Sequence, residues 1–232
     1  CLQIMGIIIK LSPVGVFALL LPVVAENGPS VLLPLLKLIL VVYAGYLIHM
    51  VVVFSITTRG LAKMSPLLFF KEMLPAMTMA FSSSSSVGAL PLNIECSQKL
   101  GAKKEIASFV LPLGATINMN GTSIYQGVCA IFIANVFGIQ LSLTQQLMII
   151  LTATLASVGT AGVPGSGVIM LSMVLQSAGL PLEGIALVAG IDRILDMGRT
   201  TLNITGDANC AVCLSAMERR KEARLAAKDA SQ

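Results

Sequence analysis

The sequence predicts an all-α polytopic membrane protein in which two re-entrant helical hairpins and broken helices form an inverted repeat. The composition is 56% hydrophobic and 11% charged, with a mean hydropathy of +0.89, whereas an average soluble domain is about 25% charged. No residue between Glu105 and Glu183 is charged, and about 20 apolar residues already cross a bilayer. Polar interruptions too rich in Ser, Gly or Pro for a continuous helix recur in both halves of the chain.

The first two elements are long apolar segments, residues 2–25 and residues 31–58. The turn residues Glu26-Asn27-Gly28-Pro29 separate them. Each is long enough for a membrane helix. The first residues already resemble the interior of an apolar helix, so we expect this chain to be part of a longer protein.

Residues 65–100 form the first predicted hairpin. Two arms shorter than a membrane crossing flank the run Ser82–Ser86. A serine-rich flexible linker is the alternative, but no charged residue beside the run would keep it in water. We therefore favour a buried hairpin tip.

Residues 102–138 are predicted to be a broken helix, because residues 114–122 are dense in amides and weak helix formers. Unwound backbone at membrane depth is tolerated where it lines a cavity, and its carbonyl oxygens are good ligands for a hard cation. Residues 142–180 repeat the hairpin pattern around the Gly- and Pro-rich segment 159–167. Interruptions at corresponding places in two halves are typical of secondary transporters that bind substrate and ions near the midplane.

The last helix is predicted over residues 183–217, followed by a basic tail, 218–232, on the cytoplasmic side. One face of this helix carries polar side chains at steps of four, three, four and four residues, which places them within roughly 80° of each other: Asp192, Asp196, Arg199, Asn203 and Asp207. Charged groups in hydrocarbon are costly and normally face a ligand, an ion path or one another. This stripe is the main candidate functional site.

Arg199 can hold a carboxylate by two parallel hydrogen bonds, and Asp196 can accept from an ammonium group. The combination favours an amino acid with an acidic side chain. A C4-dicarboxylate would leave Asp196 without an ammonium, and a neutral amino acid would leave Arg199 unpaired. The alternative is a structural network in which Asp192 pairs with Arg193 and Arg199 with Asp196.

Three strings resemble the sodium:dicarboxylate/amino acid symporters, the glutamate transporter family, and more narrowly the prokaryotic aspartate/glutamate symporters. They are Leu111 to Thr122 (LPLGATINMNGT), Gly159 to Gly165 (GTAGVPG), and Ile191 to Thr200 (IDRILDMGRT) followed by Asn203 to Asp207 (NITGD). The resemblance runs from end to end of this chain and begins at the family's fifth membrane helix, so the chain would hold the C-terminal part of the fold.

The resemblance implies a homotrimer in the cell (inner) membrane, with residues 1–28 as a scaffold-type helix and 29–232 as a transport domain that moves like an elevator. It also implies an acidic amino acid as substrate, sodium as coupling ion and no other cofactor. The implied substrate shell is Ser85, Ser86, Thr122, Val163, Gly167, Asp196, Arg199, Thr200 and Asn203.

The implied sodium ligands form two groups. One is Gly114, Asn118, Asn203 and Asp207; the other is Thr116, Ser157, Val158 and Thr160. Met119 would lie between ion and substrate sites, and Pro164 and Gly165 would belong to the gate at the second hairpin. Asp192 and Arg193 are assigned to coupling.

Two departures from the family pattern affect the predicted coupling. Asn120 stands where the family usually has an aspartate that helps to bind a third sodium, so we expect that site to be weakened. No arginine lies in the serine run, where some relatives have one, and Arg193 is positioned on the last helix to supply that charge.

Other functional classes fit less well. An intramembrane enzyme could use a serine of residues 82–86, but the single histidine, His49, lies in a separate segment. A channel would need a continuous pore instead of closed hairpin tips. Proton coupling in place of sodium stays open, and nothing in the sequence indicates binding to nucleic acid.

Overall fold

The computed structural model describes residues 32–229 and five single positions before them, Val14, Phe17, Ala18, Leu21 and Ala25. The predicted helix 1–28 thus lies almost wholly outside the described residues. Within these residues every regular element is a helix. The order is α2 (Leu32–Ile48), η2 (His49–Phe54), α3 (Ser55–Thr57), η3 (Thr58–Ala62), α4 (Pro66–Ser83), α5 (Ser86–Lys99), α6 (Lys104–Ile117), α7 (Asn120–Val136), α8 (Leu143–Ser157), α9 (Ser166–Ser177), α10 (Gly184–Ala189) and α11 (Asp192–Asp229).

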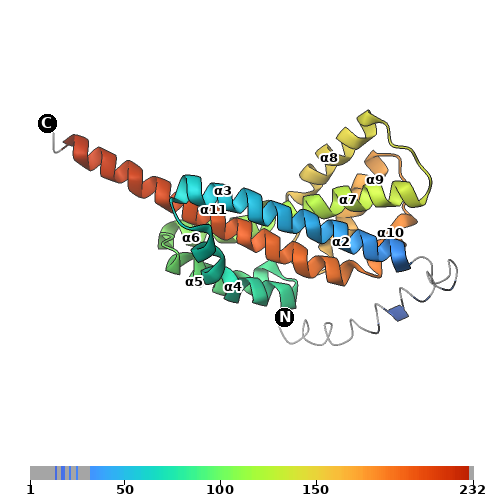
Figure 1. The fold of residues 1–232 in the computed structure, drawn as a ribbon, viewed down its shortest axis with the longest axis horizontal. Helices are drawn as coiled ribbons and strands as arrows, with labels where there is room; N and C mark the ends of the chain where they lie inside the picture. The colour runs from blue at the N-terminus through green and yellow to red at the C-terminus, as the bar shows by residue number, and fades with distance from the viewer. Residues whose placement is uncertain (1–13, 15–16, 19–20, 22–24, 26–31, 230–232) are drawn as a thin grey trace.

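The long helix α11 is the axis of the molecule (Figure 1). Its residues are mostly buried from Asp192 to Ala216, and its C-terminal turns project beyond the other helices. The sequence analysis placed one helix over 183–217, but the structure has a short α10, a bend at Gly190–Ile191, and a helix that continues into the basic tail. The tail is rich in Glu, Lys, Arg and Ala, which are strong helix formers and so extend α11.

Two hydrophobic cores pack against α11. The first gathers side chains of α2, α7, α8 and α9, with Val42, Tyr125 and Leu171 fully buried. The second gathers α4, α5 and α6 around Phe69 and Leu111. In Figure 1 the two groups of helices lie toward different ends of α11, so α11 connects two separately packed units.

The segment Leu32–Ala62 is one continuous helix and extends four residues beyond the predicted end at 58. Within the described chain it alone is long and apolar enough to cross a membrane by itself. Two stretches of it, η2 and η3, are π-helical. Beside them Thr58 and Asn209 are buried and joined by a 2.7 Å hydrogen bond, so a polar contact fixes this helix to α11.

Helices α4 and α5 form a closely packed pair whose turn is the serine run. Ser84 takes a left-handed conformation, φ 51°, which ends α4. Ser85 then caps α5, because its Oγ accepts a 3.0 Å hydrogen bond from the Gly88 N–H. The run thus supplies both the stop of one helix and the start of the next.

Helices α8 and α9 form a second pair. Ser142 begins α8 with a capping box to Gln145. The connecting segment turns at Gly159 (φ 85°) and Gly165 (φ 79°), conformations that glycine adopts without strain. Both helices are apolar and shorter than a bilayer crossing.

The chain breaks between α6 and α7 at two residues. Asn118 (φ −91°, ψ 76°) and Met119 (φ −108°, ψ 52°) leave the helical region. The break lies against α11, since a Cβ on Gly121 would come within 2.7 Å of the Arg199 carbonyl oxygen. Close approach of two backbones therefore explains the glycine there.

Candidate functional site

The polar stripe of α11 is buried in the region where α7 and the two hairpin turns meet. Its five residues expose between 1% and 7% of their surface: Asp192, Asp196, Arg199, Asn203 and Asp207. Burial of three carboxylates and one guanidinium requires internal partners. The structure shows what those partners are.

Arg199 is held by two carboxylates and one aromatic ring. Its Nη2 lies 2.7 Å and its Nε 3.1 Å from Asp196 Oδ1, and its Nη1 lies 3.3 Å from Asp192 Oδ1. The guanidinium carbon stands 4.4 Å from the centre of the Tyr125 ring, within cation–π range. A fixed, doubly paired arginine is a preorganised anion-binding group whose acidic partners already orient it.

Arg193 does not pair with Asp192, which corrects half of the structural-network alternative. Its Nη2 donates a 3.1 Å hydrogen bond to the Ser82 carbonyl oxygen, and Asp192 faces Arg199 instead. The spacing explains this, because adjacent helical residues point about 100° apart. Arg193 thereby connects α11 to the serine run. The other half, Arg199 with Asp196, is present.

A small cavity lies beside this arginine. Its walls are Ser86, Met119, Thr122, Ala161, Gly162, Val163, Ser166, Asp196, Arg199, Thr200 and Asn203. Its volume of about 10 Å³ matches roughly one water molecule. Seven of the nine residues predicted as substrate ligands line it, so the sequence pattern and the fold converge on one point.

The other two predicted ligands, Ser85 and Gly167, lie next to the cavity. Ser85 Oγ donates a 3.2 Å hydrogen bond to the Gly162 carbonyl oxygen, which belongs to the opposite hairpin turn. A Cβ on Gly167 would collide with the guanidinium of Arg199. The absence of a side chain at Gly167 thus leaves space for the guanidinium of Arg199.

The α8–α9 turn closes over the site by backbone contacts. The Gly165 N–H, next to Pro164, donates to Asp196 Oδ2 at 2.9 Å. The Gly159 N–H donates to the Thr116 carbonyl oxygen at 2.8 Å, at the end of α6. The turn is therefore fixed to both α11 and the broken helix.

Asp207 lies at the break between α6 and α7. Its Oδ1 accepts a 2.8 Å hydrogen bond from Asn118 Nδ2, and a Cβ on Gly114 would lie 2.5 Å from the same oxygen. Asn203 Oδ1 accepts from the Gly121 N–H at 2.7 Å, while its Nδ2 lies 3.1 Å from Met119 Sδ. The residues of the first predicted sodium group thus lie around the break, and Met119 contacts one of them, Asn203, while also lining the cavity.

The second predicted sodium group comprises Ser157, Val158 and Thr160, at the end of α8 and the start of the α8–α9 turn, and Thr116 of α6. The Thr160 N–H donates to the Ser157 carbonyl oxygen at 3.2 Å, and Thr116 reaches this turn through Gly159. Val158 is 49% exposed, and because its side chain is apolar, only its backbone could bind an ion.

Asn120 faces Gly206 across the break, since a Cβ added to Gly206 would lie 3.4 Å from Asn120 Nδ2. The described residues contain no cluster of three His, Cys, Asp or Glu side chains suited to a metal, so backbone and amide oxygens would have to dominate.

Sequence reasoning missed Tyr125 and the turn residues Ala161 and Gly162, whereas Ser166 lies within the backbone 163–167 that the resemblance implies would close over the substrate. Tyr125 follows Thr122 by three residues on α7, so a helical projection of the segment after the break could have found it. The turn residues lie in a loop, where no periodic pattern indicates which groups face inward.

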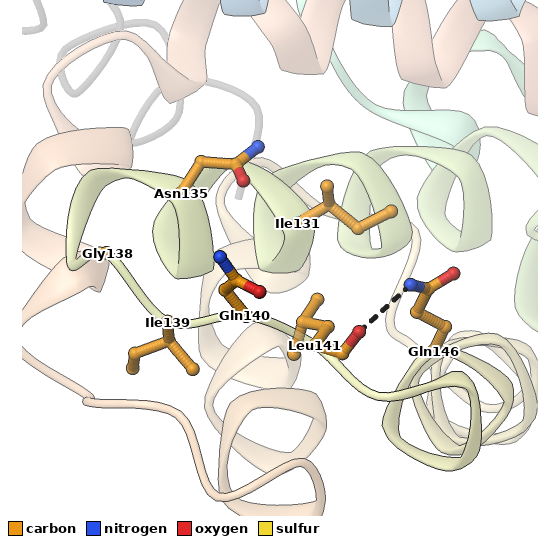
Figure 2. A pocket seen from close by; sticks show the side chains of 7 residues that line it. All are labelled: Ile131, Asn135, Gly138, Ile139, Gln140, Leu141 and Gln146. Carbon is orange, nitrogen blue, oxygen red and sulfur yellow. Dashed lines mark hydrogen bonds between the residues drawn. The ribbon is translucent and has the colours of Figure 1, made fainter.

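A larger cavity, of about 480 Å³, lies at the turn between α7 and α8 (Figure 2). Its polar side chains are the amides Asn135, Gln140 and Gln146, and Gln146 Nε2 donates to the Leu141 carbonyl oxygen at 3.2 Å. No charged side chain lines it, in contrast to the cavity beside Arg199.

Comparison with known proteins agrees with this geometry. The chain is 40% identical over 224 residues to the proton/glutamate-aspartate symporter of Escherichia coli, covering 97% of this chain and 51% of that protein. It is 39% identical over 216 residues to the proton/sodium-glutamate symport protein of Bacillus subtilis, covering 93% and 50%, and 36% identical over 210 residues to human excitatory amino acid transporter 1, covering 89% and 39%.

The chain spans about half the length of the bacterial relatives that it matches. Residues 1–217 match the family described as sodium:dicarboxylate symporters. The family and the names of the relatives describe membrane transporters and not enzymes. This chain belongs to the sodium:dicarboxylate symporter family.

Proposed function

We propose that this chain is the substrate- and ion-binding part of a secondary active symporter that imports glutamate or aspartate together with sodium. The observation that carries the proposal is the buried pair Arg199–Asp196 on the wall of a cavity closed by two hairpin turns. A guanidinium and a carboxylate side by side complement a molecule with both a carboxylate and an ammonium group.

Binding would begin with opening of the α8–α9 turn, because the present cavity is smaller than any amino acid. The side-chain carboxylate of the substrate would bind the fork of Arg199, and its ammonium group would bind Asp196. Asp196 would then release the Gly165 N–H or share an oxygen with it. Asp192 would stay paired with Arg199 and hold the guanidinium in place.

Coupling would arise because ions and substrate share structural elements. A sodium ion at Asp207, Asn118 and Asn203 would fix the break that carries Met119 and Thr122 to the substrate. A second ion held by Thr116, Ser157, Val158 and Thr160 would fix the closed turn. Hard oxygen ligands of this kind suit sodium better than a transition metal.

Proton coupling is the second candidate. Asp207 is 1% exposed, and within the described residues its carboxylate accepts a hydrogen bond from the neutral amide of Asn118, so protonation would remove a buried charge. The relatives in E. coli and B. subtilis are named as proton and proton/sodium symporters. Uptake driven separately by each ion gradient distinguishes the two.

The proposal extends to architecture. The α4–α5 and α8–α9 pairs would be re-entrant hairpins, and residues 29–232 would form a transport domain of an elevator-type homotrimer in the cell (inner) membrane. The lengths of the four helices support this, since each is shorter than a crossing and each pair turns on polar or glycine-rich residues.

The test is uptake of radiolabelled aspartate and glutamate by the full-length protein in proteoliposomes, with inward sodium or proton gradients. We expect sodium-driven uptake that Arg199→Ala abolishes and that Lys99→Ala, an exposed surface control, leaves intact. Uptake of succinate or a neutral amino acid in place of both acidic amino acids would overturn the substrate assignment.

A further inference from the structure

A second charged pocket lies at the turn that joins η3 to α4. It has a volume of about 380 Å³ and is lined by Arg59, Lys63, Met64, Ser65 and Pro66. None of these residues lines the proposed substrate cavity. The pocket is therefore a separate feature with two exposed positive side chains.

These two cations have no carboxylate partner in the described part of the chain. The ion pairs there involve Lys99, Lys103 and Arg199, whereas Arg59 and Lys63 enter none. Nearby basic groups are engaged with the protein itself: Arg220 donates to the Leu61 carbonyl oxygen, and Arg219 donates to that of Gly101. Two positive charges at this pocket are thus not neutralised by a carboxylate of the described residues.

The backbone of Lys63 adds a second observation. It is left-handed, with φ 57° and ψ 33°, and its N–H bonds the Thr58 carbonyl oxygen to end η3. Glycine adopts this conformation freely, whereas a residue with a side chain is strained there. Lysine at this position places an ammonium group on the pocket wall, where glycine would leave none.

Exposed apolar side chains precede the pocket along the same helical segment. Val52 and Ile56 are 48% and 66% exposed, and Arg59 follows Ile56 by three residues, near the end of η3. The 31-residue segment Leu32–Ala62 is longer than the roughly 20 residues that cross about 30 Å of hydrocarbon. Its basic end can therefore stand at the headgroup layer while Val52 and Ile56 lie beside acyl chains.

We propose that this pocket binds the phosphate of an anionic phospholipid, with one acyl chain lying along Val52 and Ile56. The planar guanidinium of Arg59 can hold two phosphate oxygens, and the ammonium of Lys63 neutralises the remaining charge. Basic pockets on the cytoplasmic side of membrane proteins bind anionic headgroups by this chemistry. The proposal requires only that the protein spans a membrane and does not depend on its substrate.

The chain has no tryptophan, so Met64→Trp would place the single tryptophan of this chain in the pocket wall. In the full-length protein, with any tryptophan outside this chain replaced by phenylalanine, quenching by brominated phosphatidylglycerol is compared with quenching by brominated phosphatidylcholine. We expect a preference of roughly 25-fold for phosphatidylglycerol, since each basic group near a membrane surface adds about fivefold in affinity.

The preference should fall to near one when Arg59→Gln and Lys63→Gln are added. It should persist with Lys104→Gln and Arg224→Gln, which remove the same charge from other basic positions of the chain. Equal loss in both double variants would show diffuse attraction instead of a site, and equal quenching by both lipids in the parent would also overturn the proposal. Strong competition by inorganic phosphate would assign the pocket to a soluble anion.

The variant Lys63→Gly tests whether loss of lipid preference could arise from misfolding. It removes the ammonium group and at the same time relieves the strain of the left-handed backbone at residue 63. We expect this variant to keep or increase its thermal stability and to lose about fivefold of the lipid preference. Native mass spectrometry of the protein without the tryptophan should show retained phosphatidylglycerol that the Arg59→Gln, Lys63→Gln variant lacks. An unchanged lipid count there would contradict the proposal.

Discussion

Asp196 contacts both the arginine beneath it and the hairpin turn above it: Oδ1 lies 2.7 Å from Arg199 Nη2, and Oδ2 accepts the Gly165 N–H at 2.9 Å. One carboxylate therefore links the guanidinium of Arg199 to the α8–α9 turn that covers it. A ligand that competes for either oxygen changes the attachment of the turn.

Replacement of Asp196 by Asn separates these two roles. The amide oxygen can still accept from Gly165, but the negative charge that would bind an ammonium group is gone. We expect aspartate uptake to fall at least 30-fold, consistent with about 2–5 kcal/mol for truncation of a buried charge pair. Isothermal titration and uptake measure the loss, with Thr201→Ser, on the same helix, as a mild control; aspartate affinity within threefold of the parent would contradict the assignment.

Gly114→Ala tests the proposed ion group. The new Cβ would lie 2.5 Å from Asp207 Oδ1, so the carboxylate must move. We expect the sodium concentration for half-maximal uptake to rise at least tenfold. Gly127→Ala is the matched control, because no atom lies within 4 Å of a Cβ there; it should leave sodium dependence unchanged. Equal sodium curves for both variants would remove Gly114 and Asp207 from the ion site.

Asn120→Asp tests the expected loss of a third ion site. The added carboxylate would stand near Asn118 and Gly206, at the position where the family pattern has an acid. We expect uptake to depend more steeply on sodium, with a Hill coefficient higher by about one. Asn120→Ser controls for loss of the amide alone; equal steepness in the Asp variant and the parent would refute the prediction.

The ion pairs of Lys103, which lies outside the membrane-spanning segment, should make the stability of the fold depend on pH. Hydrogen bonds to Glu222 and Glu218, at 2.6 and 3.0 Å, raise the pKa of Lys103 above its usual 10.5. A raised folded-state pKa stabilises the fold below the unfolded pKa, and the gain is lost as pH rises through the folded value.

We therefore expect Lys103→Met to lower the melting temperature at pH 8 and the difference from the parent to shrink above about pH 10.5. The difference should also decrease in high salt, since the pair is exposed. Lys104→Met, the neighbouring lysine, should show neither dependence. A constant difference from pH 8 to 11 would exclude the ion pair as its cause. Thermal unfolding in detergent measures both.

Much of the site could be predicted because its signals are local. The stripe of α11 follows from helical spacing, and the amides and glycines of residues 114–122 indicate a break that the structure has at Asn118–Met119. The π-helical turns of residues 49–62 could not be predicted, since their sequence is ordinary and their partner Asn209 lies 151 residues from Thr58. The sequence did predict that Arg193 would supply a charge at the serine run, and the structure bonds it there to Ser82, but the acceptor atom is a backbone carbonyl that carries no side-chain signal.

The continuity of α11 has a mechanical consequence. Its 38 residues contain no proline and form a rod about 57 Å long, with Asp196 and Arg199 near one end and Arg219 and Arg220 attached to neighbouring turns near the other. If α11 tilts as a rigid rod, motion at the buried arginine would reach the Leu61 turn, next to Lys63, through Arg220. Under the two proposals above, lipid held at Arg59 and Lys63 would then resist movement of the substrate site.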